Sequence, residues 1–188
     1  MELKPDDLRA ALLDPGEVTP VGRRGSVDAA VLVPIFDTGG RPGVVLTERR
    51  EDLRRHAGEI SFPGGRPEAD ESLLPAALRE AEEEIALDPG EVEVLGVLEP
   101  VSTVVTGYMI HPFVATIPTD LSFEPNPDEV AAVLLIHLDE LRQGFAMRRL
   151  VRRGVPIKTA TYVVGEHLIW GATARILRSL FELLDEPG

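Results

Sequence analysis

Residues 65–87, GRPEADESLLPAALREAEEEIAL, combine a helical apolar pattern with a high density of glutamate. Apolar residues recur at helical spacing along the second half of this stretch: Leu74, Ala77, Leu78, Ala81 and Ile85. Ser72 is a favourable N-cap, Pro75 suits a first helical turn, and Asp88-Pro89-Gly90 interrupts the pattern. The stretch therefore predicts a helix that begins after Ser72 and ends before Asp88.

Three glutamates of this helix are spaced so that their carboxylates come together. Glu80, Glu83 and Glu84 stand at i, i+3 and i+4, on a face that we expect to lie opposite the apolar stripe. Like charges at this spacing repel by roughly 0.2–0.5 kcal/mol per pair unless a cation compensates. Arg79 can neutralise one of them, most simply Glu83. The remaining oxygens suit Mg²⁺ or Mn²⁺, although a bare glutamate run is more often a solvated helix face.

The residues around the glutamates decide between these two interpretations. The full pattern reads Gly65-x5-Glu71-x7-Arg79-Glu80-Ala81-x-Glu83-Glu84-x-Ala86-Leu87. It resembles the signature of the Nudix hydrolases, with Ala86 at a position where that signature has glycine. Because glycine would permit a left-handed turn out of the helix, alanine predicts either a different exit or some strain.

The resemblance implies an α/β (α+β) fold, a Nudix-type α/β/α sandwich with a mixed central β-sheet and a loop-helix-loop metal site. It implies hydrolysis of a nucleoside diphosphate linked to another group. By position, Glu80 and Glu84 would be the main ligands of a divalent ion, and Glu83 a further ligand or catalytic group. Glu71 and Arg79 would be structural, and the Gly64 and Gly65 backbone would supply a supporting carbonyl.

The general base is less clearly marked, because in this family it often lies outside the signature. Glu129, in Asn126-Pro127-Asp128-Glu129-Val130, precedes an apolar run that predicts a strand. Relatives often keep a catalytic glutamate at such a place, so Glu129 is the candidate base. Glu124 and Asp128 are the alternatives.

A second pattern covers residues 45–65, immediately before the Nudix signature at residues 65–87. It reads Val45-Leu46-Thr47-x-Arg49-Arg50-x3-Arg54-x3-Gly58-x3-Phe62-Pro63-Gly64-Gly65. It resembles the motif of the coenzyme A diphosphatase branch, with Val45 replacing a leucine and Arg50 replacing a small residue. The resemblance implies substrate-binding roles for seven residues: Thr47, Arg49, Arg54, Gly58, Phe62, Gly64 and Gly65.

Charge is distributed unevenly along the 188 residues. Lysine and arginine number 19 against 32 acids, which gives a net charge of −13 and excludes general affinity for nucleic acid. Residues 41–66 nevertheless hold six arginines against four acids, a local charge of +2. Arginine forks suit phosphate oxygens, so this segment is compatible with one small polyanion.

A second basic cluster at 148–158 is either an exposed edge, a set of phosphate contacts or a dimer surface.

The remaining sequence predicts a single Nudix domain over residues 1–188, with an N-terminal extension and short helix within residues 1–25. Cysteine is absent, and no apolar run is long enough to span a bilayer. We expect further helices starting near 139 and covering 172–184. Strands are expected at 26–36 and 43–47, joined as a hairpin, and at 92–101, 109–117 and 129–138, with candidate edge strands at 148–151 and 159–164.

These observations predict a cytoplasmic, Mg²⁺- or Mn²⁺-dependent enzyme that hydrolyses the diphosphate of coenzyme A or its thioesters. The products would be 4′-phosphopantetheine, or its acyl form, and adenosine 3′,5′-bisphosphate. The partner is a small molecule rather than nucleic acid or membrane, and the chain is a monomer or homodimer. The alternatives are hydrolysis of ADP-ribose, a dinucleotide or a nucleoside triphosphate, and a Nudix-fold binding module without catalysis.

Overall fold

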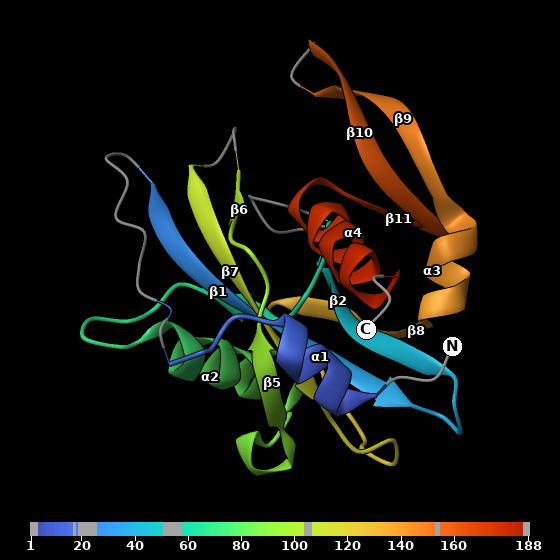
Figure 1. Ribbon diagram of the computed structural model, residues 1–188. Coiled ribbons are helices and arrows are strands. Elements are labelled where there is room, and N and C mark those ends of the chain that lie inside the picture. The colour runs from blue at the N-terminus through green and yellow to red at the C-terminus, as the bar shows by residue number, and fades with distance from the viewer. Residues whose placement is uncertain are drawn as a thin grey trace.

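A mixed β-sheet forms the centre of the molecule (Figure 1). The computed structural model describes residues 4–16, 18, 26–50, 58–103, 107–152 and 155–185. The central sheet has the order β3-β2-β1-β7-β5, with β4 beside β1, β6 beside β7 and β8 beside β2. Its strands are β1 (Val27–Asp37), β2 (Pro42–Arg49), β3 (Ile60–Ser61), β4 (Gly64–Gly65), β5 (Glu93–Val97), β6 (Val101–Ser102), β7 (Tyr108–Thr116) and β8 (Val130–His137).

Strand directions in this sheet confirm the predicted mixed type. β1 and β7 run parallel over nine residue pairs, from Val27↔Tyr108 to Ile35↔Thr116. The other pairings between the described strands of the sheet are antiparallel. β1 and β2 form the expected hairpin, in which Ile35 lies opposite Val44.

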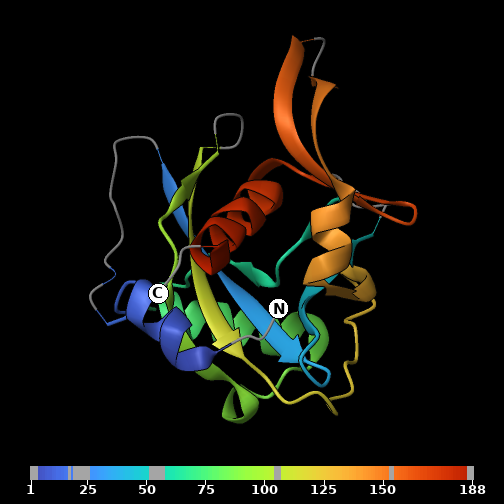
Figure 2. The ribbon, with the colours of Figure 1, turned by 45° about the vertical axis from the view of Figure 1, so that its right-hand side comes forward.

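Helices cover both faces of the sheet, as the predicted α/β/α sandwich requires (Figure 2). The helices are α1 (Pro5–Ala11), α2 (Leu73–Ile85), α3 (Leu138–Gly144) and α4 (Gly171–Asp185), with a 3₁₀ turn η1 at Pro89–Glu91. Alternate side chains of β2 pack against the helices on opposite faces of the sheet, because successive residues of a strand point to opposite faces. Val44 and Leu46 pack in the cluster that contains α4, and Val45 packs in the cluster that contains α2. None of the helices in the described ranges is long and apolar enough to cross a membrane.

The C-terminal strands form a second sheet, which corrects the expectation of edge strands at 148–151 and 159–164. β9 (Phe145–Arg152), β10 (Val155–Val164) and β11 (His167–Trp170) pair antiparallel in the order β11-β10-β9. β9 and β10 are longer than the expected strands and pair with each other over eight residue pairs, from Phe145↔Tyr162 to Arg152↔Val155. The base of this sheet joins the core through Tyr162, whose ring centroid lies 5.9 Å from that of Phe181 in α4.

The buried face of α2 differs from the predicted one. Ala77, Ala81 and Ile85 are fully buried, but Leu74 and Leu78 are only partly covered. Glu84 is 6% exposed and so lies at the buried side of the helix, not opposite it. Small alanines let α2 approach β1 and β4 closely, and this close approach draws the adjacent glutamate positions toward the sheet.

α2 ends with Ala86 in the left-handed conformation, at φ 55° and ψ 34°. The helix therefore uses the exit that the glycine of the Nudix signature would allow, and it does so with an alanine. The backbone N–H groups of Glu124 and Asn126 donate to the carbonyls of Ile85 and Glu84, at 3.1 and 2.9 Å. Tertiary hydrogen bonds thus stabilise a helix end that is locally strained.

We expect Ala86→Gly to raise the free energy of unfolding by roughly 0.5–1 kcal/mol, because a left-handed alanine costs more than the extra chain entropy of glycine. Urea unfolding of the two proteins measures this. The matched control is Ala10→Gly in α1, which has helical geometry and should destabilise the protein. If Ala86→Gly lowered the free energy of unfolding, the inference that Ala86 is strained would be wrong.

Candidate functional site

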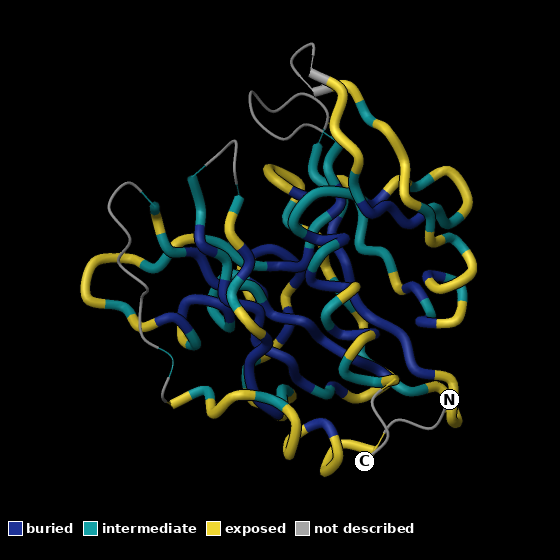
Figure 3. Tube along the Cα trace, turned by 45° about the horizontal axis from the view of Figure 1, so that its top comes forward, coloured by how far each residue is buried: buried dark blue, intermediate teal, exposed yellow. Residues whose placement is uncertain are grey.

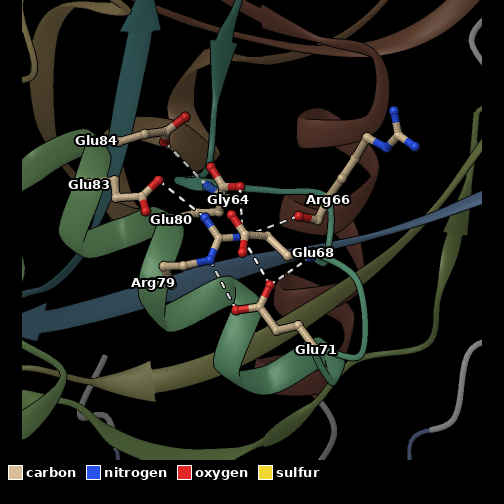
Figure 4. A network of polar contacts seen from close by, with 8 residues as sticks. All are labelled: Gly64, Arg66, Glu68, Glu71, Arg79, Glu80, Glu83 and Glu84. Carbon is tan, nitrogen blue, oxygen red and sulfur yellow. Dashed lines mark hydrogen bonds and ion pairs between the residues drawn. The ribbon is translucent and has the colours of Figure 1, made fainter.

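Arg79 in α2 joins the helix to the loop that precedes it (Figure 4). Its Nε and Nη2 donate to the two carboxylate oxygens of Glu71, both at 3.0 Å. Nη1 donates to Glu83 at 3.1 Å, which confirms the expected i, i+4 pair. Nη2 also donates to Glu80 at 3.1 Å and to the backbone carbonyl of Arg66 at 3.2 Å. One guanidinium therefore holds three carboxylates and the loop backbone.

The pKa values of this group of residues reflect the pairing. Hydrogen bonding to Arg79 lowers the pKa of Glu71, and the N–H of Glu68, which donates to the same carboxylate at 2.8 Å, lowers it further. The bonds to Glu71 in turn raise the pKa of Arg79 above its ordinary value. Glu71 and Arg79 are thus a permanently charged pair that fixes the loop on the helix.

Two glycines bring the backbone of β4 against the glutamates. Gly64 has a φ of 150°, and a Cβ there would overlap the backbone of Ala30 and Val31 in β1. A Cβ at Gly65 would overlap the carboxylate of Glu80. Both positions therefore require glycine, one for conformation and one for the approach of a side chain.

Glu84 is the most deeply buried carboxylate of the site. Its Oε2 accepts a hydrogen bond from the Gly64 N–H at 3.3 Å, as drawn in Figure 4. The pKa of Glu84 is raised from 4.5 to about 7, mainly by burial and also by the charges of Glu80 and Glu129, against the opposing effects of the Gly64 N–H and Arg49. Burial also raises the pKa of Glu80, and the charges of Glu83 and Glu129 add to the effect of burial. The carboxylates of this site are close enough to repel one another.

Glu129 lies in the loop before β8, and its charge acts on Glu80 and Glu84. The hydrogen bond from Asn126 to the end of α2 anchors this loop, and the Asn126 side chain accepts from the N–H of Asp128 at 3.0 Å. The Arg50 N–H donates to the Glu129 carbonyl at 3.1 Å. Arg49 Nη2 lies 3.4 Å from Glu129 Oε2. The predicted base and a predicted substrate-binding arginine are therefore neighbours.

The other residues of the second motif have different surroundings. Thr47 is 3% exposed, and its hydroxyl lies 3.3 Å from the Ser61 carbonyl between β2 and β3. Phe62 is 2% exposed and packs in the core. Gly58 has a φ of 66°, and its N–H donates to the Arg49 carbonyl at 3.1 Å. Arg54 lies outside the described residues.

The sequence did not reveal two backbone features of the site. The Gly64 N–H bond to Glu84 depends on how β4 lies on β1, and no sequence pattern reports that distance. The anchoring of loop 124–129 on the end of α2 had a weak signal, since Asn126-Pro127-Asp128 is a typical turn sequence. The sequence therefore indicated the turn, but it did not indicate that the turn would bind the end of α2.

The donor set fits a hard divalent cation. The site offers carboxylate oxygens, and burial raises the pKa of both Glu80 and Glu84, so a cation beside them would stabilise their charged forms. Within the described ranges, no three acidic or histidine side chains converge into a ready-made metal cluster. Arg79 explains this, since it draws Glu80 and Glu83 toward itself. Glu80 and Glu84, supported by Gly64 and Gly65, are the side chains that could hold a cation.

Comparisons with known proteins agree with this geometry. Residues 27–154 match the family model described as NUDIX domain. Proteins of Citrobacter koseri and Escherichia coli O1:K1 / APEC are each 44% identical over 155 residues, which covers 81% of this chain and 80% of theirs. Both carry the name "Uncharacterized Nudix hydrolase NudL", which specifies no substrate.

Solved structures share the fold at low sequence identity. A MutT/nudix family protein from Enterococcus faecalis has a TM-score of 0.60 at 15% identity, covering 90% of this chain and 66% of that one. The NUDIX domain of Shewanella oneidensis NrtR, complexed with ADP ribose, has a TM-score of 0.56 at 17% identity, covering 90% and 95%. At these identities the likeness establishes the fold alone.

We expect Arg79→Ala to lower the free energy of unfolding by about 2 kcal/mol or more, because it leaves partly buried carboxylates unpaired. Arg178→Ala is the matched control, since Arg178 makes an exposed i, i+4 pair with Glu182 at 2.9 Å. The control should cost less than about 0.5 kcal/mol. Urea unfolding measures both, and equal losses would refute the central position of Arg79.

The raised pKa of Glu84 predicts that the metal-free protein loses stability as pH rises. The neutral carboxyl is favoured in the folded state, so its contribution is complete below the unfolded pKa of about 4.5 and is lost as pH passes about 7. Relative to Glu84→Gln, the wild type should lose about 2–3 kcal/mol between pH 5 and 8. Urea unfolding with a chelator present checks this. The exposed control Glu82→Gln should follow the wild type, and parallel profiles for wild type and Glu84→Gln would contradict the prediction.

Proposed function

This chain belongs to the Nudix hydrolase family, and we propose that within the family it hydrolyses the diphosphate bond of coenzyme A or its thioesters. Membership makes it a hydrolase of phosphoric anhydrides in nucleoside diphosphate derivatives. The proposed products are adenosine 3′,5′-bisphosphate and 4′-phosphopantetheine, or the acyl form of the latter. The coenzyme A class is the finer part of this proposal, and it rests on the motif at residues 45–65.

One observation carries the proposal. Arg49 of that motif lies 3.4 Å from Glu129, and its charge acts on Glu84. An arginine from the proposed substrate motif is thus adjacent to the proposed metal carboxylates. A diphosphate requires this combination, because its oxygens can contact a guanidinium fork on one side and a divalent ion on the other.

Nudix hydrolases generally use divalent ions such as Mg²⁺ or Mn²⁺, and the donor set described above fits such an ion. We propose Glu80 and Glu84 as the main ligands, Glu83 as a further ligand or catalytic group, and the Gly64–Gly65 backbone as a supporting carbonyl. When bound, the ion would offset charge on the phosphate oxygens and lower the pKa of nearby water. Glu71 and Arg79 would keep the helix and its loop in register.

Glu129 is the proposed general base. It would accept a proton from a water molecule whose oxygen forms a new bond to one phosphorus, while the bridging P–O bond breaks and the other phosphate leaves. The backbone hydrogen bond from Arg50 to the Glu129 carbonyl fixes the position of this residue in the loop.

The substrate contacts that we propose are divided between direct and supporting residues. Arg49 and Arg54 would bind phosphate oxygens, which agrees with the local positive charge of residues 41–66, and Gly58 would support Arg49 through its N–H bond to the Arg49 carbonyl. Thr47 and Phe62 would support them from the strand pairing and the core in which both are buried.

We also propose that residues 1–188 act as one catalytic domain. α1 is attached to the body through the buried Leu8, the Arg9–Glu93 ion pair at 2.7 Å and the backbone bridge between Leu13 and Val97. An extension with these contacts is integral to the sheet that carries the site.

A turnover panel tests the substrate class. Free coenzyme A, acetyl-coenzyme A, ADP-ribose, a dinucleotide and a nucleoside triphosphate are compared at matched Mg²⁺ and Mn²⁺, and products are identified by mass spectrometry. We expect the coenzyme A compounds to have the highest kcat/KM and to release adenosine 3′,5′-bisphosphate. Much faster hydrolysis of ADP-ribose would refute the coenzyme A assignment while leaving the Nudix chemistry intact.

The variant Glu84→Gln is the control for catalysis in the same panel. It should lower kcat by about a hundredfold or more while the far-UV circular dichroism is unchanged, because it removes an anionic ligand without changing side-chain size. The exposed Glu82→Gln on the same helix should retain activity. Unchanged turnover in Glu84→Gln would refute the metal assignment, and a wild type without any turnover would favour the non-catalytic binding module.

A further inference from the structure

β9 and β10 form an arm that projects beyond the body of the molecule, as Figures 1 and 2 show. β11 pairs with Thr161–Val164 at the base of the arm. Farther out, β9 and β10 pair with each other from Met147↔Ala160 to Val151↔Pro156. We call residues 147–151 and 156–160 the outer arm. Two-stranded ribbons without a third strand or a covering helix are marginally stable in water.

One face of the outer arm combines apolar and basic side chains. Residues directly opposite in an antiparallel pair share a face, so Met147, Arg149 and Val151 lie on the same face as Lys158 and Pro156. Met147 is 47% exposed and Val151 73% exposed, and Figure 3 shows most of the outer arm in the exposed colour. Toward the base this face continues into Tyr162, which is buried against α4.

Arg149 and Lys158 stand directly opposite each other in the register. Like charges at such a position destabilise a strand pair unless an anionic group lies between them. Within residues 145–164 there are five basic residues and no acid, a charge of +5, so the arm supplies no anion itself. With a total of −13, the rest of the chain carries −13 − 5 = −18.

We propose that this face of the outer arm is an interface that binds the acidic body of a second copy of this chain. In a two-fold dimer each arm would lie on the other body, so the same contact would form twice. Carboxylates of the partner would lie between Arg149 and Lys158, and Met147 and Val151 would become buried. The second copy is the occupant because its body carries the opposite charge in excess, −18 against +5.

Two other arrangements fit the charges less well. β9 is the edge of its sheet, but pairing of two β9 edges would bring Arg148 and Arg149 close to their own copies. A long polyanion such as nucleic acid would extend beyond the short arm, and the negative charge of the body would repel it. The outer arm therefore matches a compact acidic surface.

Sedimentation equilibrium of the full chain at about 0.05 M and 0.5 M salt tests the proposal. We expect a monomer–dimer equilibrium at low salt that weakens at high salt. The double variant Arg149→Glu/Lys158→Glu should raise the dissociation constant about tenfold or more. The control Lys4→Glu/Arg178→Glu makes the same change in net charge at exposed positions of the body and should not raise it.

A second variant guards against misfolding of the arm. Arg149→Ala/Lys158→Ala removes the cross-strand repulsion, so it should leave the melting temperature of the monomer unchanged or higher and still weaken the dimer. A chain that stays monomeric at low salt, a dimer insensitive to both double variants, or a monomer that binds heparin instead would overturn the proposal. None of these measurements depends on which substrate is hydrolysed.

Discussion

The pairing of Arg79 with its carboxylates is the interaction on which the site depends. Glutamates at i, i+3 and i+4 on one helix repel, and a helix that carries them next to a sheet needs a cation in a fixed place. The two-pronged contact with Glu71 supplies that place, because it ties the guanidinium to the loop before α2. Loop and helix thus become one unit, and Glu80 can rest against Gly65.

Arg79 compensates only part of the acidic cluster. Glu71 and Glu83 each accept a hydrogen bond from the Arg79 guanidinium. Glu84 accepts only a backbone N–H bond from Gly64 among the contacts described, and the charge of Arg49 acts on it from farther away. The structure therefore tolerates a carboxylate whose ionisation near neutral pH is opposed by its surroundings. Such a local loss of stability is typical of functional sites, where a bound ligand supplies the missing interaction.

The sequence predicted the elements of the site better than their contacts. Spacing alone located α2, the β1–β2 hairpin and the strand after Glu129, because each has a clear apolar period and a turn at its end. It misjudged the orientation of α2, since the apolar stripe of Leu74 and Leu78 competed with alanines that allow closer approach to the sheet. The burial of Glu84 and the second sheet depend on tertiary packing, which periodicity does not report.

The parallel pairing of β1 with β7 also bears on how the site is assembled during synthesis. The two strands lie far apart in the chain, and α2 and β4 are made between them. Local contacts form before distant ones, so β1, β2, β4 and α2 can associate while β7 is still in the ribosome. The loop that carries Glu129 emerges later and docks on the end of α2. The acidic helix is therefore synthesised before its proposed base, and the proposed hydrolytic centre is complete only after the loop that carries Glu129 has docked on α2.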